Sequence, residues 1–221
     1  MKVIITGMHR SGTSMVAGLL KKCGLYLGEN LISGLRDNPR GHFEDREFVA
    51  INDRILSQNG GSWSNPPTRT LIITPLLVNR IQKFLSKWPK DKIVGWKDPR
   101  ACITLPIWKK ALKAEALKVI IVRRPWPEIA LSLEQRNGFS YEKSIELIKN
   151  YLERLEENVR GTAYINTFYH SYFTDWRSEL EHLCFFLGLH LPDDVSQIES
   201  FIDSNLWHHR VTDEYSVIPI I

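Results

Sequence analysis

Hydrophobic residues gather in four short, nearly continuous runs that are enriched in Val and Ile. Runs of this length without polar alternation are typical of strands that are buried on both faces of a sheet. The pattern therefore predicts four buried strands, at residues 2–6 (KVIIT), 92–96 (KIVGW), 118–122 (KVIIV) and 162–168 (TAYINTF).

The segments between these runs show a different pattern, in which apolar residues recur every three or four positions. It predicts helices at residues 12–23, 46–58, 75–88, 141–160 and 175–187. Buried strands that alternate with helices imply an α/β fold with a parallel sheet flanked by helices on both faces. The length fits one domain, and we predict that residues 1–221 form it.

Composition restricts the class of protein. Hydrophobic residues make up 43% of the chain and charged residues 24%, as in soluble domains, and the net charge of +4 does not call for a nucleic-acid partner. No apolar stretch approaches the roughly 20 residues of a membrane span, and we expect no signal peptide. Three cysteines without metal-binding spacing predict buried free thiols and a reducing, cytoplasmic compartment: Cys23, Cys102 and Cys184.

Basic residues follow three of the four predicted strands. GMHRSGTS (7–14) follows the first strand, KDPR (97–100) the second and RRPWPEIALS (123–132) the third, whereas YHSYF follows the fourth. The carboxyl ends of parallel strands meet at one edge of a sheet, where ligands bind. Cations that converge on that edge predict an anion pocket.

The segment after the first strand has the glycine spacing of a phosphate-binding loop. Gly7 and Gly12 permit a tight turn, and a helix that starts near Thr13 directs free N–H groups at an anion. Thr13, however, occupies the position where a kinase or NTPase loop carries lysine, and no acidic run on the second strand reads as a magnesium partner. A nucleoside triphosphate therefore fits poorly. A single 5′-phosphate that bears a transferable group fits better.

These motifs resemble those of the sulfotransferases that use 3′-phosphoadenylyl sulfate (PAPS), in particular the bacterial and Golgi-type branches. The loop RSGT after a first strand, KDP after a middle strand and a strand-end Arg followed by Ser carry the resemblance. Residues 38–53 and 201–210 also look like the bacterial branch. The resemblance implies a P-loop-like sulfotransferase fold and transfer of a sulfuryl group from PAPS to a hydroxyl or amine, with release of 3′,5′-ADP.

The resemblance also implies roles for individual residues. Arg10 and Lys97 would stabilise charge on the oxygen that leaves the sulfuryl group, and no metal is required. The 3′-phosphate would bind Ser132 and either Arg123 or Arg124, because one motif spacing selects Arg124 and the strand-end form selects Arg123. The 5′-phosphate would be held by the loop residues Arg10, Ser11, Gly12, Thr13 and Ser14.

The acceptor hydroxyl must lose a proton, which requires a general base. Glu44, in GHFED, is the first candidate, and Glu29, Asp98 and His42 are rivals. Asp98 could instead orient Arg10 or Lys97 through an ion pair.

Several other residues have two open interpretations. Trp96 and Trp126 could pack in the core or stack on adenine. The loop 60–70 could contact the acceptor, and the polar stretch His208 to Arg210 could fold over the nucleotide or face solvent.

The sequence leaves two other functions open, a small-molecule or nucleoside kinase and a non-catalytic nucleotide-binding module. It does not identify the acceptor, for which a sugar, a protein, a lipid or a small metabolite are all candidates, or the oligomeric state.

Overall fold

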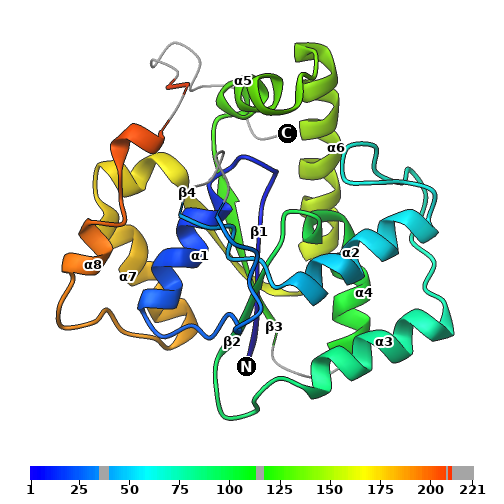
Figure 1. Ribbon diagram of the computed structural model, residues 1–221, viewed down its shortest axis with the longest axis horizontal. Coiled ribbons are helices and arrows are strands. Elements are labelled where there is room, and N and C mark those ends of the chain that lie inside the picture. Colours follow the sequence, from blue (N-terminus) through cyan, green and yellow to red (C-terminus); the bar gives the residue numbers. More distant parts are fainter. Residues whose placement is uncertain (35–39, 113–116, 208, 211–221) are drawn as a thin grey trace.

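The computed structural model describes residues 1–34, 40–112, 117–207 and 209–210, and a four-stranded parallel sheet lies at its centre. The strand order is β2-β1-β3-β4 (Figure 1). This arrangement confirms the predicted α/β architecture and the positions of all four predicted strands, within two residues at each end. The predicted burial is wrong for the fourth strand, which lies at the edge of the sheet and is largely exposed. The strands are β1 (Lys2–Thr6), β2 (Val94–Lys97), β3 (Leu117–Arg123) and β4 (Ala163–Phe168).

The register of the sheet brings the carboxyl ends of the strands together. Ile5 of β1 pairs with Lys97 at the end of β2, and Arg123 at the end of β3 pairs with Phe168 of β4. The chain passes from β1 to β2 on one side and then crosses back to β3 on the other side of β1. The end of β1 is thus the point where the strand order reverses, which is where ligands bind in such sheets.

Helices cover both faces of the sheet (Figure 1). The helices α1, α7 and α8 lie on one face, and α2, α3, α4 and α6 lie on the other. The described helices are α1 (Thr13–Lys22), α2 (Arg46–Gln58), α3 (Pro75–Ser86), α4 (Ala101–Leu112), α5 (Trp126–Asn137), α6 (Tyr141–Val159), α7 (Trp176–Leu187) and α8 (Ser196–Glu199), with short 3₁₀ turns at Tyr169–Phe173 and Ser204–Leu206.

Alternate residues of the central strands feed two separate cores. Val3 and Ile5 of β1 face α1 and α7, whereas Ile4 packs with residues of α2, α3 and α4. All three side chains are fully buried, and each such burial stabilises the fold by about 1.5–3 kcal/mol. The runs are continuous in sequence because both faces of the sheet are covered.

The core between the sheet and the helices α2, α3 and α4 contains an aromatic cluster that includes Trp96. Its ring stacks on Phe48 with centroids 5.6 Å apart, and only 1% of Trp96 is exposed. Trp126 is half-buried and packs beside Tyr141. Both tryptophans therefore have the packing role, and neither lines the cavity described below.

Two expectations drawn from composition can be compared with the structure. Cys23, Cys102 and Cys184 are buried free thiols, as predicted. Among the residues that the structure describes, no helix is long and apolar enough to cross a bilayer.

Candidate active site at the carboxyl edge of the sheet

The glycine loop between β1 and α1 has the conformation that its sequence predicts. Gly12 is the N-cap of α1 and lies in the left-handed region at φ 94°, and no side chain in the described part of the chain caps the helix. A Cβ atom on Gly12 would overlap the ring of Tyr169, and one on Gly7 would overlap the carbonyl oxygen of Val122. The loop can therefore pack closely on its neighbours only with glycine at these positions.

We predict that Gly12→Ala destabilises the fold by about 2 kcal/mol or more, because it combines left-handed backbone strain with a clash against Tyr169. Gly138 is a matched control, since it lies at φ 66° and a Cβ there would meet nothing within 4 Å. Gly138→Ala should lower the free energy of unfolding by about 1 kcal/mol, because it adds only the strain of a left-handed backbone. The free energy of unfolding of both variants can be measured by urea denaturation. If both variants lose the same amount, the proposed close packing of the loop is contradicted.

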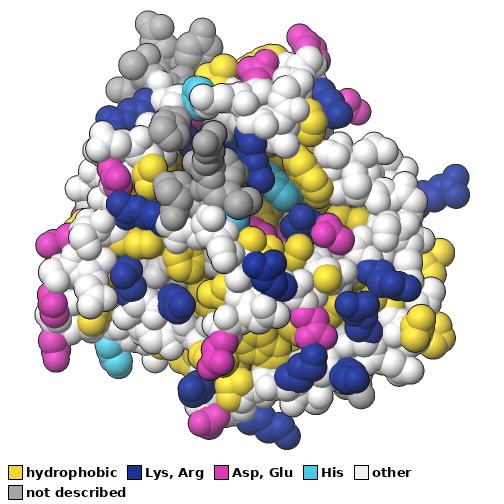
Figure 2. All heavy atoms as spheres, in the orientation of Figure 1, with side chains coloured by type: hydrophobic (Ala, Val, Ile, Leu, Met, Phe, Trp, Pro, Cys, Tyr) yellow, Lys and Arg dark blue, Asp and Glu magenta, His cyan; other side chains and the backbone are white. Residues whose placement is uncertain are grey.

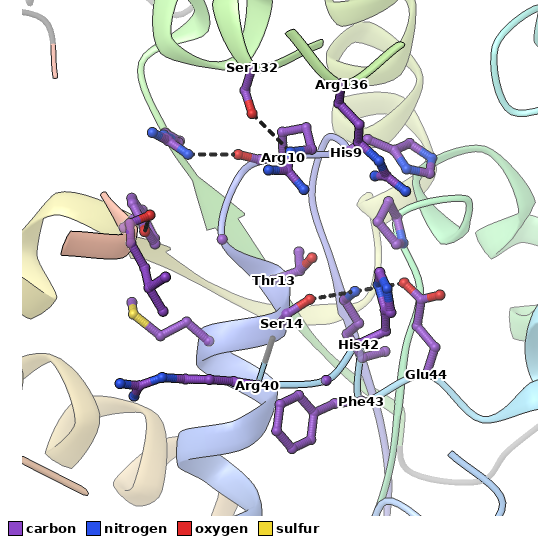
Figure 3. A pocket seen from close by; sticks show the side chains of 18 of the residues that line it. His9, Arg10, Thr13, Ser14, Arg40, His42, Phe43, Glu44, Ser132 and Arg136 are labelled. Atoms are coloured by element: carbon purple, nitrogen blue, oxygen red, sulfur yellow. Dashed lines mark hydrogen bonds and ion pairs between the residues drawn. The ribbon is translucent and has the colours of Figure 1, made fainter. Parts of the chain in front are cut away.

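A cavity of about 540 Å³ lies in front of this loop (Figure 3). Its volume lies in the range of about 300–1,000 Å³ that is usual for small-molecule sites. Figure 2 shows the molecule hollowed in this region, with Lys, Arg and His side chains in the hollow. The cavity brings together most of the predicted site residues, namely Arg10, Gly12, Thr13, Ser14, His42, Glu44, Lys97, Arg124 and Ser132.

Four predicted residues lie outside the cavity lining. The hydroxyl of Ser11 is buried beneath the loop and has no hydrogen-bond partner among the described residues. Glu29 lines a separate hollow beside Tyr26 and Trp88, so its candidacy as the general base is not supported by its position. Asp98 and Arg123 also do not line the cavity, and their contacts are described below.

Lys97 and Glu44 form a nearly buried ion pair in the cavity. The Nζ atom of Lys97 lies 2.6 Å from Oε1 of Glu44 and also donates to Oγ of Ser14 at 3.1 Å. Their side chains are only 3% and 12% exposed. Burial by itself raises the pKa of Glu44, but the charge and hydrogen bond of Lys97, together with the charges of Arg100 and His42, outweigh it, and the net pKa is lowered. Glu44 is therefore an ionised carboxylate in this structure.

Glu44 is held in place by the start of α2. The next residue, Asp45, is the N-cap of that helix, and its carboxylate accepts from the backbone N–H groups of Glu47 and Phe48 at 2.9 Å. The backbone of Glu44 also accepts from the N–H of Ile32 at 2.8 Å. The two flanking contacts fix the direction in which the Glu44 side chain leaves the chain.

Arg10 is held in an unusual backbone conformation, at φ 71°. Such a conformation costs a residue with a side chain about 1–3 kcal/mol, and it persists where surrounding contacts fix it. Here the Nε atom of Arg10 donates to Oγ of Ser132 at 2.8 Å, and its carbonyl oxygen accepts from Nη1 of Arg124 at 3.1 Å. Arg10 thus joins the loop to α5 and to the segment that precedes it.

The structure distinguishes between the two candidate arginines after β3. Arg124 lines the cavity, and its guanidinium is fixed by Glu128 at 2.7 Å and by the face of Tyr169, 4.6 Å from the ring centroid. Arg123 donates to Asn166 at 2.9 Å and pairs with Glu156, so it faces away from the cavity. Of the two, only Arg124 is placed to contact a ligand there.

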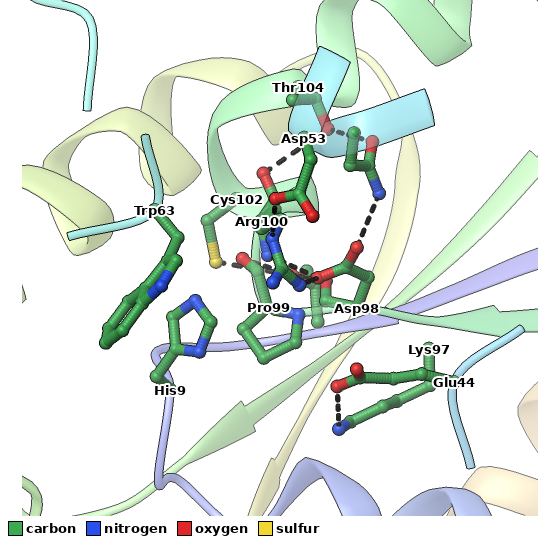
Figure 4. Close-up of polar contacts among 12 residues, drawn as sticks. His9, Glu44, Asp53, Trp63, Lys97, Asp98, Pro99, Arg100, Cys102 and Thr104 are labelled. Atoms are coloured by element: carbon green, nitrogen blue, oxygen red, sulfur yellow. Dashed lines mark hydrogen bonds and ion pairs between the residues drawn. The ribbon is translucent and has the colours of Figure 1, made fainter. Parts of the chain in front are cut away.

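The alternative roles for Asp98 are not supported by its contacts (Figure 4). Its carboxylate accepts from Asn52 at 2.8 Å and from the guanidinium of Arg100 at 3.0 Å, and it is fully buried. Burial, above all, raises the pKa of Asp98. Among the described contacts, Asp98 does not form the ion pair with Arg10 or Lys97 that was considered above, and it does not line the cavity. It joins the end of β2 to α2 instead, because Asn52 belongs to α2.

Sequence reasoning missed other residues of the cavity. His9, Arg40 and Arg136 add further positive or polar groups, and Phe201, Asp203 and Leu206 form a wall near the C-terminal end. Arg40 reaches across to that wall and pairs with Asp203 at 3.2 Å. His9 belongs to the glycine loop GMHRSGTS, so its place in the sequence could have identified it as a residue of the site.

The expectations for the C-terminal stretch and for the loop 60–70 have partial answers. His208 lies outside the described residues. His209 bonds Gln135 at 2.9 Å, and the guanidinium of Arg210 lies 4.6 Å from the ring centroid of Trp207. The loop 60–70 does not line the cavity, but its Trp63 packs against His9 with ring centroids 4.6 Å apart.

The charges that line the cavity favour an anion. Two carboxylates line it, Glu44 and Asp203, and each is paired with a cation. Within the described chain, no group of three or more His, Cys, Asp or Glu side chains could hold a metal ion. The cations in the lining are Arg10, Arg40, Lys97, Arg124 and Arg136.

No protein-family model and no curated protein sequence matches this chain, but several solved structures resemble it. The sulfotransferase domain of the olefin synthase of Synechococcus PCC 7002 aligns over 100% of this chain and 89% of its own length, with a TM-score of 0.57 and 16% identity. A sulfotransferase domain from the curacin biosynthetic pathway aligns over 86% and 75%, with a TM-score of 0.54 and 15% identity. A sulfotransferase from Alicyclobacillus acidocaldarius aligns over 88% and 84%, with a TM-score of 0.51 and 13% identity. The chain therefore has the P-loop-like α/β fold of the sulfotransferases.

Proposed function

We propose that this protein is a sulfotransferase that moves a sulfuryl group from PAPS to a hydroxyl or amine and releases 3′,5′-ADP. One observation carries the proposal. The cations of three separate strand ends, Arg10, Lys97 and Arg124, line the same cavity as the uncapped start of α1. A nucleotide that is phosphorylated at both the 5′ and 3′ positions requires such a divided set of cations.

In this proposal the two phosphates bind at different ends of the cavity. The 5′-phosphate lies against the first turn of α1, where Gly12, Thr13 and Ser14 offer N–H and hydroxyl donors and the helix dipole favours negative charge. The 3′-phosphate lies against Arg124 and Ser132. Arg124 is already fixed by Glu128 and Tyr169, so little conformational freedom is lost when it binds the phosphate.

Sulfuryl transfer breaks the bond between sulfur and the oxygen that bridges sulfate and phosphate, while the acceptor oxygen forms a new bond to sulfur. Negative charge grows on the bridging oxygen as it leaves. Arg10 and Lys97 are the groups that stabilise this charge, and their attraction is stronger in the transition state than in the ground state. The donor carries no triphosphate, so the mechanism uses no metal.

Glu44 is the proposed base that takes the proton from the acceptor. In the structure it is paired with Lys97, which makes it a weak base. When Lys97 turns toward the phosphosulfate, the carboxylate loses its cation and its pKa rises, because the remaining burial disfavours the charged form. Binding of the donor thus activates Glu44 at the moment when the base is needed.

The direct experiment is incubation of the protein with PAPS, with release of 3′,5′-ADP followed by chromatography. We expect release with PAPS, by transfer to water or to an added alcohol, and no phosphoryl transfer from ATP with magnesium. The reverse result would favour the kinase alternative. Binding of PAPS without release would favour the non-catalytic module.

We predict that Glu44→Gln lowers turnover by roughly 10²-fold or more. The substitution keeps the shape of the side chain, so the affinity for 3′,5′-ADP should remain within a few fold. The measurement is release of 3′,5′-ADP at saturating PAPS, with binding by calorimetry as the control. Unchanged turnover would transfer the role to His42, the remaining rival that lines the cavity.

A further inference from the structure

His9 is a cavity residue to which the proposed mechanism gives no role. It lies in the glycine loop between Met8 and Arg10 and lines the cavity beside Arg136 (Figure 3). Its ring packs between two aromatic side chains, with centroids 4.6 Å from Trp63 and 5.5 Å from Tyr151. The backbone of the loop and these two rings fix the position of the imidazole.

The contacts of Tyr151 indicate which nitrogen of His9 carries the proton. The hydroxyl of Tyr151 has a single hydrogen and donates it to the carbonyl oxygen of Trp63 at 2.9 Å. The Nε2 atom of His9 lies 3.4 Å from the same hydroxyl oxygen. With the hydroxyl hydrogen in the shorter of these two contacts, Nε2 is the donor in the other. A neutral imidazole carries one N–H, which leaves Nδ1 with a free lone pair.

The surroundings of His9 keep it neutral. Burial lowers its pKa well below the usual value, and Arg100, Lys97, Arg136 and Arg10 lower it further through their positive charge. Nδ1 is thus a hydrogen-bond acceptor in a cavity whose charged groups are mostly donors.

The carboxylate of Glu44 is a second hydrogen-bond acceptor in the cavity lining. Figure 4 shows the carboxylate of Glu44 on the other side of Pro99 from His9, and all three residues line the cavity. A ligand with one hydroxyl group can satisfy only one of the two acceptors. A ligand with two neighbouring hydrogen-bond donors can satisfy both, and an unsatisfied polar group in such a site lowers affinity for the wrong ligand.

We propose that Nδ1 of His9 binds a second polar hydrogen of the acceptor substrate while Glu44 takes the proton of the attacking hydroxyl. The proposal rests on the sulfotransferase function proposed above. It assigns His9 as a specificity-determining residue and defines the acceptor class as molecules with adjacent donor groups, such as a vicinal diol.

The test uses two probes of equal carbon number, 1,2-propanediol and 1-propanol, at equal concentration with PAPS. Sulfate monoesters are quantified by mass spectrometry. The wild type should sulfate the diol at least about tenfold faster, after correction for its two hydroxyl groups.

Two variants of His9 separate the roles of its ring nitrogens. Asparagine places an amide oxygen where Nδ1 lies, whereas glutamine extends its amide toward the position of Nε2. His9→Asn should therefore keep most of the preference for the diol, and His9→Gln should lose it. An equal preference in both variants and the wild type would contradict the proposal, as would equal loss in both variants.

A spectroscopic measurement tests the tautomer without any acceptor. In protein labelled with ¹⁵N-histidine, NMR should show His9 with a protonated Nε2 and a bare Nδ1. Tyr151→Phe should abolish this preference, because it removes the partner of Nε2. A bare Nε2 in the wild type would overturn the assignment.

The two proposals fail in different ways. If PAPS gives no 3′,5′-ADP with either alcohol or with water, the sulfotransferase function is wrong and the role of His9 falls with it. If 3′,5′-ADP is released but the preference for the diol is the same in the wild type and the His9 variants, only the role of His9 is wrong.

Discussion

Replacing Lys97 with methionine is expected to lower PAPS turnover by about 10²- to 10³-fold, the usual effect of removing one donor that stabilises a developing oxyanion. Methionine keeps most of the side-chain length but has no charge, so the bridging oxygen loses a partner. Saturating turnover, measured as release of 3′,5′-ADP, should fall far more than the affinity for 3′,5′-ADP, which lacks the sulfuryl group.

The same substitution leaves Glu44 nearly buried without its ion-pair partner. Removal of one member of such a pair typically costs about 3–5 kcal/mol of stability, so Lys97→Met should also lower the unfolding midpoint in urea. The double variant Lys97→Met with Glu44→Gln removes both charges. It should regain most of the stability but none of the turnover. Recovery of turnover in the double variant would contradict the catalytic roles of both residues.

Arg124→Gln is expected to weaken binding of 3′,5′-ADP by about 10- to 100-fold, because charge-assisted hydrogen bonds to a phosphate contribute about 1.5–3 kcal/mol. The measurement is isothermal titration calorimetry. Binding of 5′-AMP, which has no 3′-phosphate, should change far less in the same variant. Some stability will be lost as well, since Glu128 is only 1% exposed and is partnered by Arg124 at 2.7 Å.

The neighbouring arginine provides the matched control. Arg123 adjoins Arg124 in sequence but bonds Asn166 and Glu156 outside the cavity. Arg123→Gln should leave the affinity for 3′,5′-ADP within about twofold, the range of surface changes. A larger loss in Arg123→Gln than in Arg124→Gln would reverse the assignment of the 3′-phosphate site.

The central strands were predictable because strands that are buried on both faces consist of consecutive apolar residues. The strands β1, β2 and β3 consist mainly of buried apolar residues, and a parallel sheet that is covered on both faces needs such runs, whereas β4 at the edge of the sheet is largely exposed. The helix α4 was not predictable in the same way. It is buried on nearly all sides and contains Pro106, so it shows neither a one-sided apolar pattern nor the usual helix composition.

The site was predictable as far as strand ends determine it. The motifs at three strand ends identified the part of the cavity lining that includes Arg10, Lys97 and Ser132. The choice between Arg123 and Arg124 depended on where β3 ends. The strand ends at Arg123, whose side chain is directed to its neighbours in the fold, and the chain then turns so that Arg124 meets the cavity.

Two other features depended on residues far apart in the sequence. The carboxylate of Asp98 accepts a hydrogen bond from Asn52 of α2, which is 46 positions away in the sequence. The ring of His9 contacts the hydroxyl of Tyr151, which is 142 positions away. No local pattern links either partner to the residue that it contacts. Long-range packing of this kind sets the direction of a polar side chain, and a local pattern does not contain it.

The central claim is that one cavity holds a nucleotide phosphorylated at both the 5′ and 3′ positions of its ribose. Thermal denaturation of the protein with 3′,5′-ADP or with ATP and magnesium tests it most directly. At about 100 times its dissociation constant, 3′,5′-ADP should stabilise the fold by roughly 2.7 kcal/mol and raise the Tm by roughly 5–10 °C, with little shift from ATP and magnesium. A shift with ATP and magnesium but none with 3′,5′-ADP would contradict the account.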